Sequence, residues 1–380
     1  MVRRKILFLQ TEDSTFYSHR LPMARAALST GAEVVVAVRV VAHRERLERE
    51  GLRVVALPWR RSGVNPFSEM RTLAAIVRLY AAERPDLVHQ VTLKPILYGS
   101  LAAALAGVPA AVNALTGLGF IFISESWVAR LLRLGAGLAM KAAFSRPGSV
   151  ALFQNEDDRA VFLSRGLVAR ERTVLIRGSG VDTARFAPSP EAEGVPLVVL
   201  PARMLWDKGV GEFVEAARLL AAEGVKARFA LIGEQDDENP AAVPPARLAE
   251  WKASGAVEWW GLRDDMAEIY ARAHVVCLPS YREGLPKALM EAAACGRPVV
   301  GADVPGCREV VRDGETGLLV PARDARALAS ALGRLIADKP LRERLGAGGR
   351  RLAVAEFAQE RIAEQTKAVY ERLLAIRSTT

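Results

Sequence analysis

The stretch that decides the fold is residues 275–298, VVCLPSYREGLPKALMEAAACGRP. Its first four residues, Val275–Leu278, form an apolar run of the length of a buried strand, and an alanine-rich helical pattern extends from Pro286 to Gly296. Proline suits the first position of a helix, and glycine suits its end. The intervening Ser280–Gly284 segment is therefore predicted to be a loop at the carboxyl end of a strand, where open α/β sheets bind ligands.

The same alternation of strand and helix patterns runs along the rest of the chain, which predicts parallel sheets. A stretch rich in proline and small polar residues, 184–196, has the composition of a linker and separates two such series. We therefore expect an α/β protein with two Rossmann-like, doubly wound domains, 1–187 and 188–355, facing a central cleft. Residues 356–380 are expected to form a helix that packs back toward the N-terminal domain, and a break in the last helical region is expected near Ala347–Gly349.

The composition fits this reading and restricts the classes of function. Of the 380 residues, 51% are hydrophobic and 25% are charged, so both domains can bury a core. The net charge of +9 favours anionic partners, but the cations are scattered and RNA-binding aromatic motifs are missing, so nucleic acid is not expected. The N-terminal apolar run is short and no stretch has the about 20 apolar residues of a membrane span, which predicts a cytoplasmic protein.

The three cysteines and four histidines show no metal-binding spacing, and we expect buried or near-surface reduced thiols. The acidic pairs Asp157-Asp158, Asp236-Asp237 and Asp264-Asp265 could be proposed as metal ligands. Helix caps and solvated turns are the simpler interpretation.

A second group of candidate residues opens the C-terminal domain. A predicted strand, Leu197–Leu200, is followed by Arg203 and, five residues on, by Lys208, just before a helical pattern at Val210–Ala222. Two fixed cations beside a helix N-terminus suit a diphosphate. Taken alone, a loop arginine or lysine is more often a solvated surface residue, as is an isolated Glu283 or Glu291.

Together these motifs resemble the retaining GT-B glycosyltransferases of family 4. Arg203 and Lys208 match the R-x4-K signature of that family, and Glu283 and Glu291 match its E-x7-E signature. The resemblance implies that Arg203 and Lys208 neutralise the diphosphate leaving group of a nucleotide sugar and that Glu291 binds the ribose. It further implies that Glu283 holds the donor sugar, that Arg263 lies beside the base, and that the sugar is also gripped by the backbone of Gly284, Leu285, Pro286 and Lys287.

The resemblance implies retention of anomeric configuration, no metal ion and no cofactor. UDP is the expected nucleotide, carrying a hexose or an N-acetylhexosamine. The loop TEDSTFYSHRLP, residues 11–22, resembles a subgroup that extends lipid-linked or capsular oligosaccharides, so a lipid-linked or cell-surface polysaccharide acceptor is expected. Many relatives place a histidine where this chain has Thr116.

Candidate residues on the acceptor or donor-sugar side lie near predicted strand ends of the N-terminal domain: His19, Arg20, His89, Lys94 and Thr116. A packed histidine and a solvated lysine remain open for His89 and Lys94. The segment 121–141 mixes apolar residues with three cations and could attach to an anionic membrane surface, although core packing explains its apolar positions equally well.

Other classes of protein remain to be separated from a glycosyltransferase. A nucleotide-sugar epimerase shares the double-Rossmann architecture, and a basic nucleic-acid-binding protein would share the charge. A dinucleotide oxidoreductase is disfavoured because no G-x-G-x-x-G follows Lys5–Leu9.

Overall fold

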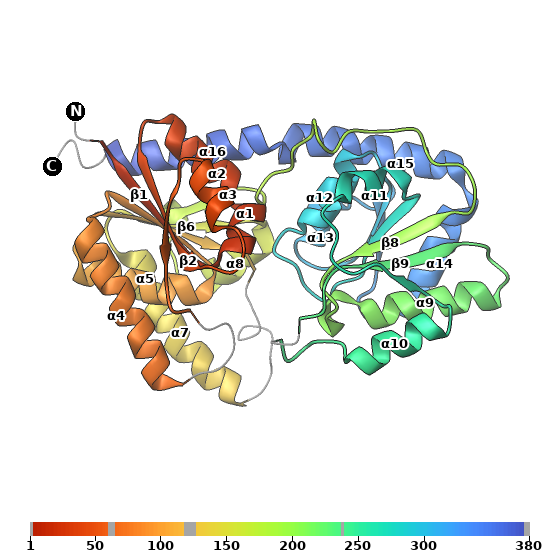
Figure 1. Cartoon of the computed structure of the whole chain (residues 1–380), viewed down its shortest axis with the longest axis horizontal. Helices are drawn as coiled ribbons and strands as arrows, with labels where there is room; N and C mark the ends of the chain where they lie inside the picture. Colours follow the sequence, from red (N-terminus) through yellow and green to blue (C-terminus); the bar gives the residue numbers. More distant parts are fainter. Residues whose placement is uncertain (1–2, 60–64, 118–126, 237–238, 376–380) are drawn as a thin grey trace. The chain divides into compact units, whose positions relative to one another are not determined.

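The computed structural model describes residues 3–59, 65–117, 127–236 and 239–375, with only the backbone for 127–134. The chain forms two compact units (Figure 1): unit 1 comprises Met1–Ser179 with Glu360–Thr380, and unit 2 comprises Gly180–Gln359. The chain thus crosses between them after Ser179 and after Gln359, eight residues before and four residues after the boundaries expected from the sequence. The backbone explains the shift. Val181 donates its N–H to the Phe357 carbonyl and accepts from the Gln359 N–H, so both connections are tied together within unit 2.

Unit 1 is built on a parallel sheet with strand order β3-β2-β1-β4-β5-β6-β7. Its strands are β1 (Lys5–Glu12), β2 (Glu33–Arg39), β3 (Arg53–Ala56), β4 (Leu87–Val91), β5 (Ala110–Leu115), β6 (Ser149–Phe153) and β7 (Thr173–Leu175). Its helices are α1 (Asp13–His19), α2 (Leu21–Ser29), α3 (Arg44–Arg49), α4 (Pro66–Glu83), α5 (Leu93–Leu105), α7 (Trp127–Ser145), α8 (Glu156–Ser164), the 3-10 turn η1 (Arg170–Arg172) and α16 (Gln359–Ala375).

The last helix, α16, belongs to the core of unit 1. Ile362, Val369, Tyr370 and Leu373 are buried in the same cluster as the strand residues of β1 and β2. This packing buries one side of α16 and leaves its charged side outward, as expected for an amphipathic helix. Residues from the far end of the chain therefore complete the N-terminal domain.

Unit 2 has a second parallel sheet, with strand order β10-β9-β8-β11-β12-β13. Its strands are β8 (Leu197–Pro201), β9 (Arg228–Ile232), β10 (Glu258–Trp259), β11 (Val275–Leu278), β12 (Val299–Ala302) and β13 (Gly317–Val320). Its helices are the 3-10 turn η2 (Trp206–Lys208), α9 (Val210–Ala222), α10 (Pro245–Ala253), α11 (Met266–Arg272), α12 (Lys287–Ala294), α13 (Cys307–Val310), α14 (Ala325–Ala337), α15 (Lys339–Leu352) and the π-helical turn Ala353–Phe357.

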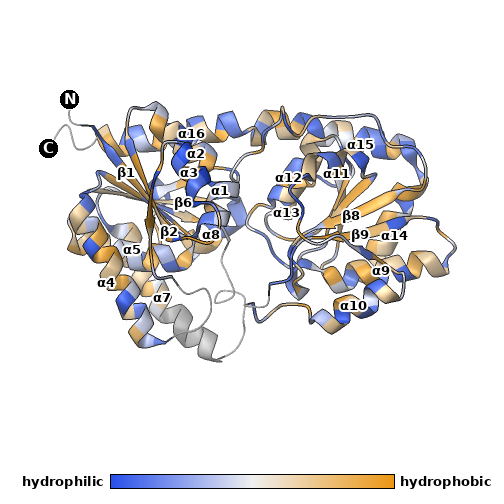
Figure 2. Cartoon of the chain, in the orientation of Figure 1, coloured by the Kyte–Doolittle hydropathy of each residue, from blue (hydrophilic) through white to orange (hydrophobic). Residues whose placement is uncertain are grey.

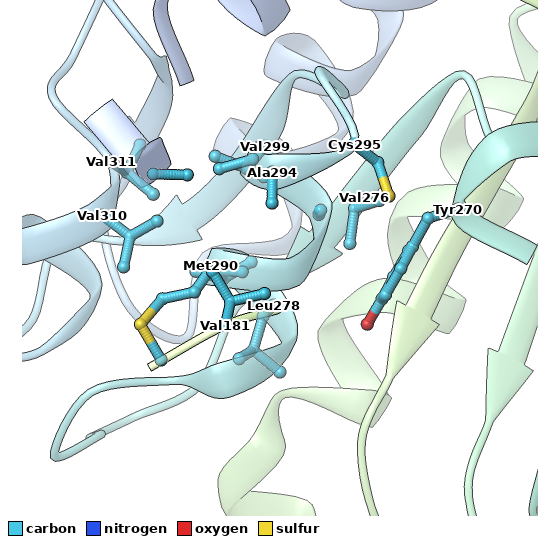
Figure 3. Packing of buried hydrophobic residues seen from close by; sticks show 14 of the residues in the cluster. Val181, Tyr270, Val276, Leu278, Met290, Ala294, Cys295, Val299, Val310 and Val311 are labelled. Carbon is cyan, nitrogen blue, oxygen red and sulfur yellow. The ribbon is translucent and has the colours of Figure 1, made fainter. Parts of the chain in front are cut away.

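The strands of both sheets are apolar over most of their length, whereas the helices alternate apolar and polar surfaces (Figure 2). This is the pattern of a parallel sheet covered by helices on both faces. In unit 2 the cluster around α12 includes Met290, Ala294 and Cys295, packed with Tyr270 and Val276 (Figure 3). The burial of α12 fixes its N-terminal end at the carboxyl edge of the sheet. All three cysteines are buried free thiols.

The helical region after α14 breaks at a different place from the one expected. Residues 347–349 continue α15 as a regular helix, and the break is the π-helical turn Ala353–Phe357, after which Ala358 leaves the helical conformation. The glycines of α15 serve close packing: a Cβ on Gly346 would lie 2.0 Å from the Gly296 carbonyl oxygen, and one on Gly348 would lie 2.2 Å from the Glu315 carbonyl oxygen.

In the parts of the chain that the structure describes, none of the helices is both long and apolar enough to cross a lipid bilayer.

Candidate functional site

The R-x4-K segment lies where the sequence predicted it, at the carboxyl end of β8. Arg203 is the second residue after the strand, and its Nη1 donates to Asp236 Oδ2 at 2.5 Å. Lys208 ends η2, and its Nζ lies 2.7 Å from Glu283 Oε1. Neither pair is fully exposed, because the side chain of Asp236 is 4% exposed and that of Glu283 is 13% exposed. Both cations therefore have carboxylate partners before any ligand binds.

Two loops of unit 2 are held against each other at this point. Gly209 has φ +72°, and a Cβ there would lie 2.3 Å from the Pro279 carbonyl oxygen. Tyr281 donates its N–H to the Asp207 carbonyl at 2.9 Å. Only glycine fits such a close approach at a left-handed position. The loop after β8 and the loop after β11 thereby bring Lys208 and Glu283 together.

The loop after β11 continues into α12 as the sequence predicted, with one small difference. Pro286 has the extended conformation of a cap residue, so the helix begins at Lys287. Gly284 and Leu285 are buried, and Gly306 from the following loop approaches so closely that its Cβ would lie 2.6 Å from the Glu283 and Gly284 carbonyl oxygens. The segment that presents Glu283 is thus supported from two sides.

Glu291 lies on the second turn of α12, beside the same loop. Its Oε1 is 3.5 Å from Lys287 Nζ, and its Oε2 accepts a long hydrogen bond of 3.4 Å from Tyr270 Oη. Burial raises the pKa of the Glu291 carboxyl above its ordinary value, against the opposing effects of Lys287 and Tyr270. A half-buried, weakly satisfied carboxylate next to a loop is suited to accept hydrogen bonds from ligand hydroxyls.

Arg263 is not joined to this cluster by any described contact. It lies on the loop after β10 and forms a two-point ion pair with Asp265, at 2.8 and 2.5 Å. Asp265 is the residue that precedes α11, where we expected a capping carboxylate, but its side chain bonds Arg263 instead of the helix N-terminus.

Two of the N-terminal candidates form one buried cluster. His89, in the middle of β4, is fully buried, stacks on Phe8 and shares a 2.6 Å hydrogen bond between its Nδ1 and Tyr370 Oη of α16. The sequence left open whether His89 packs in the core or contacts a ligand, and in the structure it packs in the core. Arg20 is 2% exposed, and the hydrogen bond described for its guanidinium runs from Nη1 to Met23 Sδ, at 3.5 Å.

Burial governs the protonation of this cluster. It lowers the pKa of His89 well below the ordinary value, helped by the neighbouring Arg20, so the imidazole is neutral at physiological pH. Burial also lowers the pKa of Arg20 to about 10, so its guanidinium stays charged. Unit 1 therefore contains a buried cation without a described carboxylate partner.

The other N-terminal candidates have different partners. His19 ends α1 and has its Nδ1 2.7 Å from the Ser18 hydroxyl. Lys94 donates to Glu69 at 2.7 Å, and Thr116 is half-buried directly after β5. Residues 118–126, and the side chains of Arg130 and Arg133, lie outside the described residues.

The carboxyl edge of the unit 2 sheet therefore presents two cations and two carboxylates within one pair of loops and one helix. Such a set can bind a diphosphate and hydroxyl groups together. Within the described ranges, no three His, Cys, Asp or Glu side chains gather closely enough to hold a metal ion.

Comparison with known proteins identifies the family. One family model, described as "Glycosyl transferase 4-like", matches residues 5–144, and another, "Glycosyl transferases group 1", matches residues 195–338. The chain is 30% identical to the alpha-maltose-1-phosphate synthase of Mycolicibacterium smegmatis, over 77% of this chain and 81% of that protein. The chain belongs to glycosyltransferase family 4.

A further relative of this glycosyltransferase is N,N'-diacetylbacillosaminyl-diphospho-undecaprenol alpha-1,3-N-acetylgalactosaminyltransferase of Campylobacter jejuni, 28% identical over 97% of this chain and 99% of the relative. Among solved structures, sucrose-phosphate synthase from Thermosynechococcus elongatus aligns with a TM-score of 0.81 at 22% identity, covering 98% of this chain and 100% of the other. The Anabaena protein HepE, in complex with UDP-glucose, aligns with a TM-score of 0.76 at 19% identity, covering 97% and 99%. The two α/β units are those of the GT-B fold.

The sequence did not indicate two residues that contact the family 4 motifs or their loops, Asp236 and Tyr281. Asp236 had been considered only as a cap or a metal ligand, and the structure pairs it with Arg203. Tyr281 donates its hydroxyl to Glu212 at 2.7 Å, and Arg323 lies 4.5 Å above its ring. No local pattern signals these contacts, because they join segments that follow different strands.

The raised pKa of Glu291 predicts a pH dependence of stability. A carboxyl whose pKa is higher in the folded state favours folding most below its unfolded-state pKa, near 4.5, and this contribution is lost as the pH rises through the folded-state value. Glu291→Gln should therefore gain stability relative to the wild type as the pH increases from about 4.5 to 7.5.

Urea unfolding across this pH range measures the difference. Glu258→Gln is the control, because Arg228 lowers the pKa of Glu258 and the stability that this carboxylate contributes is lost only as the pH falls below about 4.5. This variant should therefore differ from the wild type by a nearly constant amount between about pH 4.5 and 7.5. A Glu291→Gln protein that is less stable than the wild type by a constant amount at every pH would contradict the assignment.

Proposed function

We propose that this enzyme transfers a hexose or N-acetylhexosamine, with retention of anomeric configuration, from a UDP-sugar to a lipid-linked or polysaccharide acceptor. The observation that carries the proposal is the convergence of Arg203, Lys208, Glu283 and Glu291 at one edge of unit 2. The names of relatives support the substrates: one uses an undecaprenol-linked diphosphate acceptor, and HepE has been solved with UDP-glucose.

The chemistry assigns a role to each side chain. Departure of UDP leaves negative charge on the diphosphate, and fixed cations at that position stabilise the charge as it develops. We assign this to Arg203 and Lys208. Glu291 would accept from the ribose hydroxyls, and the backbone from Gly284 to Lys287 would border the donor sugar.

Glu283 is assigned to the hydroxyls of the donor sugar. Its Oε1 is held by Lys208 at 2.7 Å, an arrangement that suits positioning better than covalent attack. Retention would then come from attack by the acceptor on the face that the diphosphate leaves. Arg263, 20 residues before Glu283, remains a candidate for contact with the base; it would have to give up or share its pairing with Asp265.

The residues on the acceptor side remain proposals. His19 and Thr116 are partly accessible candidates. Lys94 could bind a ligand if its ammonium group left the carboxylate of Glu69. Arg20 would contact a phosphate only at the edge of its buried cluster, and His89 is the least accessible of the set.

Removal of either cation tests the diphosphate assignment. Arg203→Ala and Lys208→Ala should each lower turnover by roughly 100-fold or more, as expected for loss of a donor to developing charge. Circular dichroism and thermal unfolding check that each variant folds. Arg228→Ala removes an arginine from an exposed ion pair at the opposite edge of the same sheet and should leave turnover unchanged. Near-normal transfer by Arg203→Ala or Lys208→Ala would refute the assignment.

We further propose that transfer needs neither a metal ion nor a cofactor, because Arg203, Lys208 and the N-terminus of α12 supply positive potential for the diphosphate. Turnover measured as release of UDP should persist after dialysis against EDTA. Loss of activity in EDTA that Mg²⁺ or Mn²⁺ restores would instead assign a metal-binding role to one of the acidic pairs.

Finally, we propose peripheral attachment of unit 1 to the cytoplasmic face of an anionic membrane, where a polyprenyl-linked acceptor would be held. The support is the net charge of +9 and the exposed Leu138 and Lys141 on α7. Each lysine or arginine near an anionic surface contributes about 1 kcal/mol, so a few suffice for reversible attachment that weakens with salt.

Charge reversal on α7 tests this attachment. The triple variant Arg130→Glu, Arg133→Glu, Lys141→Glu should sediment less with anionic liposomes and transfer more slowly to a lipid-linked acceptor, with little change on a short water-soluble one. The control carries the same charge change on exposed residues of unit 2: Arg218→Glu, Lys226→Glu and Lys252→Glu. Equal losses on both acceptors would give the segment a structural role, and unchanged sedimentation would place the contact elsewhere.

A further inference from the structure

Residues 233–236 and 239–243, which follow β9, are folded against the segment that carries Arg203. Met204 donates its N–H to the Glu234 carbonyl, Trp206 donates to Ala241, and Val243 donates back to Met204, at 2.9 to 3.0 Å. The two segments already lie close together at Gly233, where a Cβ would lie 1.9 Å from the Ala202 carbonyl oxygen. The backbone on both sides of Arg203 is therefore fixed by this second segment.

Asp236 is the side chain by which this segment reaches Arg203. Its carboxylate is 4% exposed, whereas the Arg203 side chain is 39% exposed, so the acid is anchored in the protein and the guanidinium extends from it toward solvent. The Asp236 carbonyl also accepts the Asn239 N–H at 2.9 Å. One nitrogen, Nη1, is engaged, and the rest of the guanidinium has no acceptor among the described residues.

A carboxylate at this position is unexpected from charge alone. A negative group beside a cation that binds diphosphate repels the same ligand and lowers its affinity. A long arginine side chain, however, loses rotamer freedom when it binds a ligand, and a partner that has already fixed its orientation removes that loss.

We propose that Asp236 is a positioning residue, which holds the Arg203 guanidinium in the orientation that receives the donor diphosphate. The proposal rests on the proposed function, since it assigns Arg203 to that diphosphate. It makes Asp236 part of donor recognition without contact to the donor.

Charge repulsion by Asp236 and positioning of Arg203 by Asp236 predict opposite changes in ligand affinity when the carboxylate is removed. If Asp236 acted only through its charge, Asp236→Ala would tighten the binding of UDP and of inorganic pyrophosphate. If it positions Arg203, the same variant should weaken both by about tenfold, and Asp236→Asn, which keeps an acceptor oxygen, should recover part of the loss. Titration calorimetry with UDP and with pyrophosphate measures both changes, and Glu258→Gln serves as the control that opens an exposed ion pair in the same unit.

A double-mutant cycle shows whether Asp236 acts through Arg203. In an Arg203→Ala background, Asp236→Ala should cause no further weakening of UDP binding, because the group that it positions is gone. Thermal unfolding of all four proteins confirms that binding is compared between folded states.

The outcomes separate this proposal from the function on which it rests. Tighter binding by Asp236→Ala, or the same fold-loss with and without Arg203, would overturn the positioning role while leaving the diphosphate assignment intact. Normal UDP and pyrophosphate binding by Arg203→Ala would instead remove the assignment of Arg203 to the diphosphate, and the role of Asp236 with it.

Discussion

The approach of the Gly209 backbone to the Pro279 carbonyl is the constraint on which the candidate site depends. It sets the separation of the loops after β8 and β11, which carry one motif each. With the loops in contact, the Lys208 and Glu283 side chains are close enough to pair, and the Tyr281 N–H finds its acceptor on Asp207. Backbone contact between the two loops thus sets the geometry of the site, and the ion pair of Lys208 with Glu283 forms within that geometry. Side chains on two flexible loops could not hold the same geometry without that contact, since each would lose conformational freedom on binding.

The general architecture could be predicted from the sequence because its determinants are local. Apolar runs such as Val275–Leu278 and Leu197–Leu200 mark the strands, and a parallel sheet places the residues that follow them at one edge. This is why Arg203, Lys208, Glu283 and Glu291 could be grouped before the structure was known. The spacing of each motif and its position after a strand carried the information.

What could not be predicted involves contacts between segments distant in sequence. The segment Ala347–Gly349 suggested a helix break, but Gly348 instead allows close packing against the Glu315 carbonyl oxygen, a contact that the local pattern does not show. The burial of His89 depends on Tyr370, 281 residues later. The pairing of Asp236 with Arg203 likewise requires the fold of the segment after β9, so the acid looked like a cap or a metal ligand in the sequence alone.

The place of α16 in unit 1 also bears on the order in which the chain can fold during synthesis. Phe8 and His89 pack against Tyr370, so this side of the N-terminal core stays uncovered until the ribosome has made almost the whole chain. Unit 2 has all of its own segments by residue 359 and can close its core first. A nascent N-terminal domain must therefore keep an apolar surface exposed through the synthesis of unit 2, which is the interval in which aggregation and chaperone binding compete with folding.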